Sequence, residues 1–128
     1  MPKKPLSFTS RMRSFKHAYA GISTLLKSQQ NAWIHAAATV LVITAGLCFK
    51  ITPAEWCWLV LAITAVWSAE AFNTALEFLA DVASPEFHPL VKQAKDVAAG
   101  AVLISAIGAA IIGSIVIGPY AMRMTKCE

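Results

Sequence analysis

Four polar side chains repeat along one stripe of the run EAFNTALEFLAD, residues 70–81. They are Glu70, Asn73, Glu77 and Asp81. With 3.6 residues per turn, the spacing i, i+3, i+7 and i+11 places all four on one face of a helix. The run continues an uncharged, largely apolar stretch that starts at Trp56. Because ionisable groups on a membrane helix are costly and rare, the stripe predicts a functional site.

Other reactive side chains follow the stripe closely. Glu86 and His88 lie in the next loop, and Lys95 and Asp96 open the following helix. Paired carboxylates suit Mg²⁺ at a nucleotide, lysine provides a point charge for phosphate, and a helix N-terminus offers free N–H groups to an anion. A further carboxylate can accept the proton of an attacking hydroxyl. Phosphoryl transfer needs these components, and the absence of GxxxxGK[ST] excludes a P-loop enzyme.

Two other interpretations of the stripe stay open on these residues alone. A polar seam can hold a helical oligomer together without any catalysis. An intramembrane glutamate with asparagine and aspartate partners can also relay a proton or a cation, as in an ion-conducting subunit.

The composition indicates one integral membrane domain over residues 1–128. Apolar residues make up 57% of the chain and charged residues only 14%, against about 25% charged in soluble proteins. The net charge of +4 is not accompanied by aromatic–basic interleaving or by a nucleic-acid-binding module. Nucleic acid is therefore excluded as a partner.

The elements that must position the stripe are all helical. Residues 8–29 are predicted to form an amphipathic helix on the membrane surface, because apolar residues recur there at spacings of three and four among basic ones. Three helices over 32–49, 56–83 and 96–118 are predicted to contain the membrane spans. Residues 84–93 are expected to form a loop, and Pro119 is expected to end the third span. His35, near the start of the first span, is interpreted as a structural or interfacial group.

The distribution of lysine and arginine predicts the orientation. The N-terminal region and the 84–96 segment together hold eight of these residues, and the opposite side holds Lys50, Arg123 and Lys126. The positive-inside rule therefore places the N-terminus and the acidic stripe in the cytoplasm. A cleaved signal peptide is not expected, because no apolar core directly follows the basic start MPKKPLSF.

The chain resembles the small prokaryotic diacylglycerol kinase and undecaprenol kinase family. The resemblance rests on the pattern ExxNTAxE…D…AKDxAAGAV and extends from Phe15 to about Pro119. The segments SFKHAYAG and QNAWIH fit the family more loosely. The resemblance implies a surface helix and three spans assembled as a homotrimer. It also implies active sites between chains, at the cytoplasmic face of the inner membrane.

The implied reaction is transfer of the γ-phosphate of ATP to a lipid hydroxyl with Mg²⁺. The product is phosphatidic acid if the substrate is diacylglycerol, or undecaprenyl phosphate if it is undecaprenol. Diacylglycerol is the first candidate, on the name and breadth of the family. An apolar groove discriminates weakly between two such lipids, since a difference of one methylene group changes the binding free energy by only about 1–3 kcal/mol. QNAWIH resembles the undecaprenol kinase branch more.

The resemblance also implies roles for individual residues. Glu70 matches the catalytic base, Asn73 its partner in the site, and Glu77 a ligand of the metal and of the ATP phosphates. Gln29 stands where the best-known members carry a glutamate as second metal ligand, and its carbonyl can ligate Mg²⁺ but brings no charge. The residues that match nucleotide contacts are His17, Glu86, Phe87, His88, Lys95 and Asp96, of which Asp96 is also expected to take part in catalysis.

Overall fold

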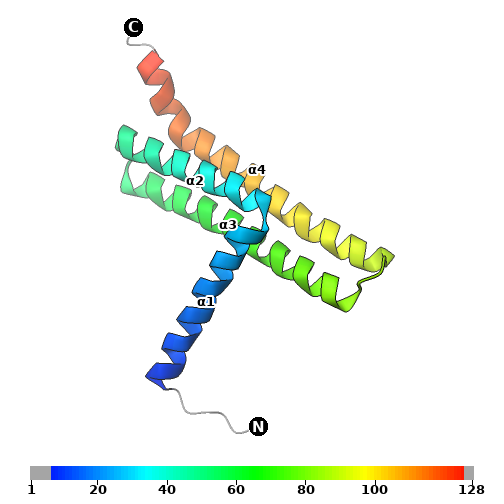
Figure 1. Cartoon of the computed structure of the whole chain (residues 1–128). Helices are drawn as coiled ribbons and strands as arrows, with labels where there is room; N and C mark the ends of the chain where they lie inside the picture. The colour runs from blue at the N-terminus through cyan, green and yellow to red at the C-terminus, as the bar shows by residue number, and fades with distance from the viewer. Residues whose placement is uncertain (1–6, 126–128) are drawn as a thin grey trace.

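Four helices joined by short connections make up the computed structural model, which describes residues 7–125 (Figure 1). They are α1 (Phe8–Ser28), α2 (Gln30–Phe49), α3 (Pro53–Ala83) and α4 (Pro89–Thr125). No strand occurs within this part of the chain, so the predicted all-α fold is confirmed. Residues 1–6 of the basic N-terminal segment and 126–128 of the tail lie outside the described residues.

Helices α2, α3 and α4 are each long and apolar enough to cross a membrane, as predicted. At 1.5 Å per residue, the 20 residues of α2 extend about 30 Å, close to the thickness of a bilayer core. The 31 residues of α3 and the 37 residues of α4 extend about 46 Å and about 55 Å. Figure 1 shows α3 and α4 continuing side by side past the start of α2.

Helix α1 points away from the three long helices (Figure 1). Its apolar residues Met12, Phe15 and Tyr19 are exposed, whereas Leu25, near its end, is buried. The extended backbone of Gln29 separates α1 from α2, with φ −119° and ψ 122°. This arrangement agrees with the predicted amphipathic helix ahead of the spans, because the exposed apolar face suits a membrane surface.

The turn between α2 and α3 is fixed by local backbone chemistry. Lys50 adopts a left-handed conformation (φ 52°) that ends α2. Thr52 and Glu55 form a reciprocal capping box at the start of α3, where Pro53 is the first residue. The direction in which α3 returns along α2 is therefore set within a few residues.

The predicted loop over 84–93 is too long, because α4 already begins at Pro89. Proline is favoured in the first turn of a helix, where its missing N–H costs nothing. The side chain of His88 caps this helix, since its Nδ1 accepts the N–H of Leu90 at 3.2 Å. The connection is thereby reduced to residues 84–88.

The prediction that Pro119 ends the last helix is also wrong, because α4 continues through it to Thr125. A proline inside a helix removes one backbone hydrogen bond. Tertiary contacts compensate here: the ring of Tyr120 stacks on Phe49 with centroids 5.8 Å apart, and its hydroxyl donates to Oε2 of Glu55 at 2.8 Å.

Gly46 marks the closest approach of α2 to the start of α3. A Cβ atom there would lie 2.7 Å from Cη2 and 2.8 Å from Cζ2 of Trp56, and 3.2 Å from Cδ1 of Ile51. We expect Gly46→Ala to destabilise the fold by about 1–3 kcal/mol, because overpacking forces the indole ring to shift. The measurement is the midpoint of thermal unfolding in detergent.

Gly21→Ala in α1 is the matched control, since nothing lies within 4 Å of a Cβ at that position. Its midpoint should stay unchanged or rise slightly, because alanine favours helix over glycine. Equal midpoints for the two variants would contradict the close approach at Gly46.

Candidate active site

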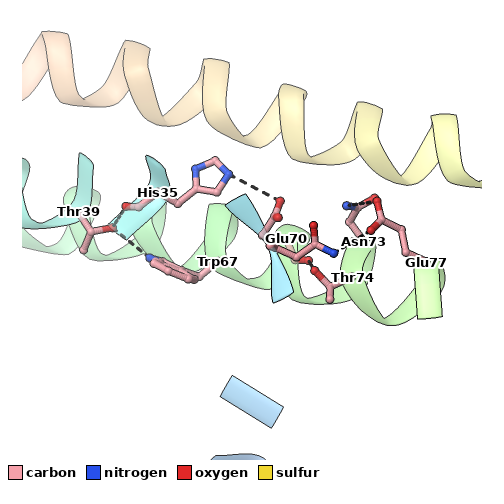
Figure 2. Close-up of polar contacts among 8 residues, drawn as sticks. His35, Thr39, Trp67, Glu70, Asn73, Thr74 and Glu77 are labelled. Atoms are coloured by element: carbon pink, nitrogen blue, oxygen red, sulfur yellow. Dashed lines mark hydrogen bonds and ion pairs between the residues drawn. The ribbon is translucent and has the colours of Figure 1, made fainter. Parts of the chain in front are cut away.

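Glu70 is fully buried in the middle of α3, at 0% exposure (Figure 2). Neither of its carboxylate oxygens accepts a hydrogen bond within residues 7–125. The ionisable side chain beside it is His35 of α2, whose Nε2 lies 3.7 Å from Oε2 of Glu70. A buried carboxyl group without hydrogen bonds is costly, and such groups in native proteins call for a functional explanation.

A second cluster forms around Glu77, two turns further along α3. The side-chain amide of Gln29 donates to Oε2 of Glu77 at 2.9 Å, and that of Asn73 donates to Oε1 at 3.3 Å. The carbonyl oxygen of Asn73 is buried and has no partner among the described residues. The structure thus brings together Gln29, Asn73 and Glu77, which the sequence analysis had placed in one site.

The donor set around Glu77 suits Mg²⁺ bound together with phosphate. No group of three or more histidine, cysteine or acidic side chains that could hold a metal occurs among residues 7–125. Mg²⁺ does not require such a cage, because it binds through one or two carboxylates plus phosphate and water oxygens. Glu77 provides a carboxylate, and the carbonyl oxygens of Gln29 and Asn73 are oxygen donors of the type that Mg²⁺ accepts.

Lys95 of α4 reaches across to the acidic stripe of α3. Its Nζ donates to Oδ1 of Asp81 at 2.8 Å. Asp96 pairs instead with Lys92 on its own helix. The ammonium group of Lys95 therefore lies at the end of the stripe, whereas Asp96 is directed to a lysine outside the predicted set.

The remaining predicted nucleotide contacts are spread over the surface. His88 and Lys95 line one groove of about 470 Å³ between the ends of α3 and α4. Glu86 and Phe87 are exposed in the connection beside it. His17 is exposed on α1 and, within residues 7–125, makes no hydrogen bond or ion pair with the other predicted site residues.

His35 lies beside Glu70, a contact that the sequence analysis does not predict, since it interprets His35 as a structural or interfacial group. Its ring meets the edge of Trp67 with centroids 6.4 Å apart, and the indole N–H of Trp67 donates to Thr39, one turn further along α2, at 3.0 Å. The pairing of His35 with Glu70 could have been inferred from the position of the turn at 50–52. Antiparallel helices place residues about equally far from their turn opposite each other, and His35 and Glu70 satisfy this condition.

The chain is similar to a known protein family and to individual members of it. Residues 16–117 match the model of the prokaryotic diacylglycerol kinase family. The chain is 38% identical over 107 residues to an undecaprenol kinase of Bacillus subtilis, covering 84% of this chain and 87% of that protein. It is 40% identical over 107 residues to a diacylglycerol kinase of Synechocystis, covering 83% of this chain but only 61% of that protein.

A diacylglycerol kinase of Helicobacter pylori is 31% identical over 104 residues, covering 76% of this chain and 81% of that protein. The matched region contains α2, α3 and most of α4, and with them both polar clusters. The chain therefore belongs to the prokaryotic diacylglycerol kinase family and is a lipid kinase.

Proposed function

We propose that this lipid kinase transfers the γ-phosphate of ATP to the hydroxyl group of a membrane lipid with Mg²⁺, and that Glu70 is the general base. The observation that carries the proposal is the carboxyl group of Glu70, buried and without a hydrogen bond on a helix that can span a membrane. A lipid hydroxyl that enters beside it would supply the missing donor. The same contact aligns the hydroxyl for removal of its proton.

Glu77, Gln29 and Asn73 would hold the metal and the phosphates. Bound Mg²⁺ supplies charge that stabilises the phosphate oxygens during transfer. Gln29 and Asn73 orient Glu77 through their amide groups. Because Asn73 lies between Glu70 and Glu77 on α3, it also fixes the spacing between the base and the phosphate site.

Lys95 would contact the phosphates of the nucleotide, and Asp81 holds its ammonium group in place until the nucleotide binds. Glu86, Phe87, His88 and Asp96 would line the path of the nucleotide, with His17 approaching from α1. The excess of lysine and arginine on the N-terminal side supports a cytoplasmic site, which is where ATP is available.

Assembly as a homotrimer in the inner membrane is part of the proposal. Added Cβ atoms at Gly100, Gly108 and Gly113 of α4 would meet nothing within 4 Å in the single chain. Small residues of this kind allow close packing of helices in membranes. A second chain packed against α4 would bring its own groups towards the site.

Two lipids are candidates for the acceptor. Diacylglycerol is favoured by the family and by two of the relatives named above. Undecaprenol is favoured by the relative whose length matches this chain best, at 87% coverage. Both lipids carry a primary hydroxyl that can reach the membrane interface.

The test is phosphate transfer from labelled ATP in mixed micelles, with diacylglycerol and undecaprenol offered side by side and Mg²⁺ varied. We expect label in one of the two lipids, dependent on Mg²⁺. Glu70→Gln protein, purified in parallel, serves as the blank for contaminating kinases. Absence of label in both lipids, with folded and oligomeric protein, would overturn the proposed substrates.

A further inference from the structure

The proton that Glu70 would accept has to leave the site before the next turnover. Glu70 is 0% exposed, and within the described part of the chain its oxygens have no hydrogen-bond partner. In the single chain, water does not reach the carboxylate of Glu70 directly. A protonated Glu70 needs an adjacent base that can take the proton over.

His35 lies where such a base is required (Figure 2). Its Nε2 is 3.7 Å from Oε2 of Glu70, about 1 Å longer than a charge-assisted hydrogen bond. Catalytic contacts are often this long before substrate binds. The side chain of His35 is 15% exposed, whereas that of Glu70 is fully buried, so of the two groups His35 is the more accessible. Histidine is the side chain that most readily takes up and releases a proton near neutral pH.

Two ionisable groups further along the stripe, Glu77 and Lys95, are engaged with partners of their own. Both carboxylate oxygens of Glu77 accept hydrogen bonds, from Gln29 and Asn73. Lys95 is paired with Asp81 at the far end of the stripe. Of the described side chains within 4.0 Å of the Glu70 carboxylate, His35 is the one that can act as a base.

His35 also lines a groove of about 550 Å³ between α2, α3 and α4. The wall from α4 includes Ala106, Ala109 and Ala110, and no described residue of the groove other than His35 is titratable. A cavity of about 150 Å³ is enough to bind benzene. Free imidazole can therefore occupy the space that a truncated His35 would leave.

We propose that His35 is the group that receives the proton from Glu70, an inference that rests on the proposed function of Glu70 as base. As the lipid oxygen bonds to the γ-phosphorus, its proton passes to Oε2 of Glu70, and ADP leaves with the electron pair of the broken P–O bond. The proton then moves to Nε2 of His35, which restores the carboxylate and creates an imidazolium. The imidazolium releases the proton to water.

The experiment compares His35→Ala and His35→Gln by kcat and by KM for ATP, with and without added imidazole. We expect His35→Ala to lower kcat by about 10²-fold, the lower end of acid–base effects, with KM for ATP unchanged. Imidazole should restore at least a tenth of the lost rate. His35→Gln offers an amide but no base, so it should remain slow.

Ile63→Ala is the control for the groove, because Ile63 lines the same space and its truncation opens a void without removing a base. Imidazole should not accelerate this variant. Wild-type kcat in His35→Ala or His35→Gln, lack of rescue in folded His35→Ala, or equal stimulation of Ile63→Ala would each overturn the relay.

Glu70→Gln, measured beside these variants, separates the two proposals. If it is inactive while His35→Ala turns over at the wild-type rate, the base stands and the relay fails. If Glu70→Gln itself retains the wild-type rate, Glu70 is not the base, and the relay fails together with it.

Discussion

Glu70→Gln is expected to lower kcat for lipid phosphorylation by about 10²- to 10⁴-fold, the range that general bases contribute. The amide has the shape of the carboxyl group but cannot accept the proton of the lipid hydroxyl. KM for ATP should change little, because Glu70 makes no hydrogen bond to the cluster around Glu77. The measurement is initial rates in mixed micelles at saturating Mg²⁺.

The same variant should remain folded and be at least as stable as the parent protein. Glu70 is buried and its oxygens accept no hydrogen bond among the described residues, so an amide of the same shape breaks no hydrogen bond. Glu55→Gln is the matched control: it is the same change on the same helix, at the far end near the α2–α3 turn. Loss of kcat in Glu55→Gln as large as in Glu70→Gln would mean that the loss does not come from a base.

Glu77→Gln is expected to raise the Mg²⁺ concentration required for half-maximal activity by about tenfold or more, and to lower kcat as well. It removes the carboxylate that Gln29 and Asn73 hold in place, and Mg²⁺ binds through one or two carboxylates. Binding of Mg²⁺ and ATP should then stop protecting the protein. A ligand at 100 times its Kd stabilises a folded protein by about 2.7 kcal/mol, which a thermal unfolding midpoint detects.

Gln29→Glu provides the reciprocal test. It places a second carboxylate beside Glu77, so repulsion should lower the unfolding midpoint without metal, whereas Mg²⁺ should restore it and bind more tightly. Glu55→Gln should leave the Mg²⁺ dependence unchanged, although it weakens the cap of α3. If both Glu77→Gln and Gln29→Glu show the Mg²⁺ dependence of the parent protein, Mg²⁺ does not bind at this cluster.

Much of the fold could be predicted from the sequence, because its determinants are local. Apolar runs of sufficient length predict the spans, and the change from the amphipathic pattern of 8–29 to the apolar run of 32–49 predicts a break close to Gln29, where the structure has it. The stripe of Glu70, Asn73 and Glu77 follows from helical periodicity alone, since residues three and four apart share a face. The hydrogen bond between Asn73 and Glu77 is a consequence of that spacing.

The limits of the last helix could not be predicted, because they depend on contacts from elsewhere in the chain. Local sequence rules predict that the helix ends at Pro119. It continues, because Phe49 and Glu55 hold Tyr120, the residue after the proline, in place. The start at Pro89 depends on the His88 side chain, which acts as a cap although histidine is not a common capping residue.

Helical periodicity shows from the residues alone which side chains share a face of a helix, whereas only the packing of the helices shows which faces meet. Pairing of His35 with Glu70, and of Gln29 with Glu77, depends on the register of α2 against α3. That register is set by the left-handed turn at Lys50 and by the indole of Trp56 against Gly46. Periodicity is repeated in every turn of a helix, whereas a register between two helices is fixed only where the chain reverses and packs.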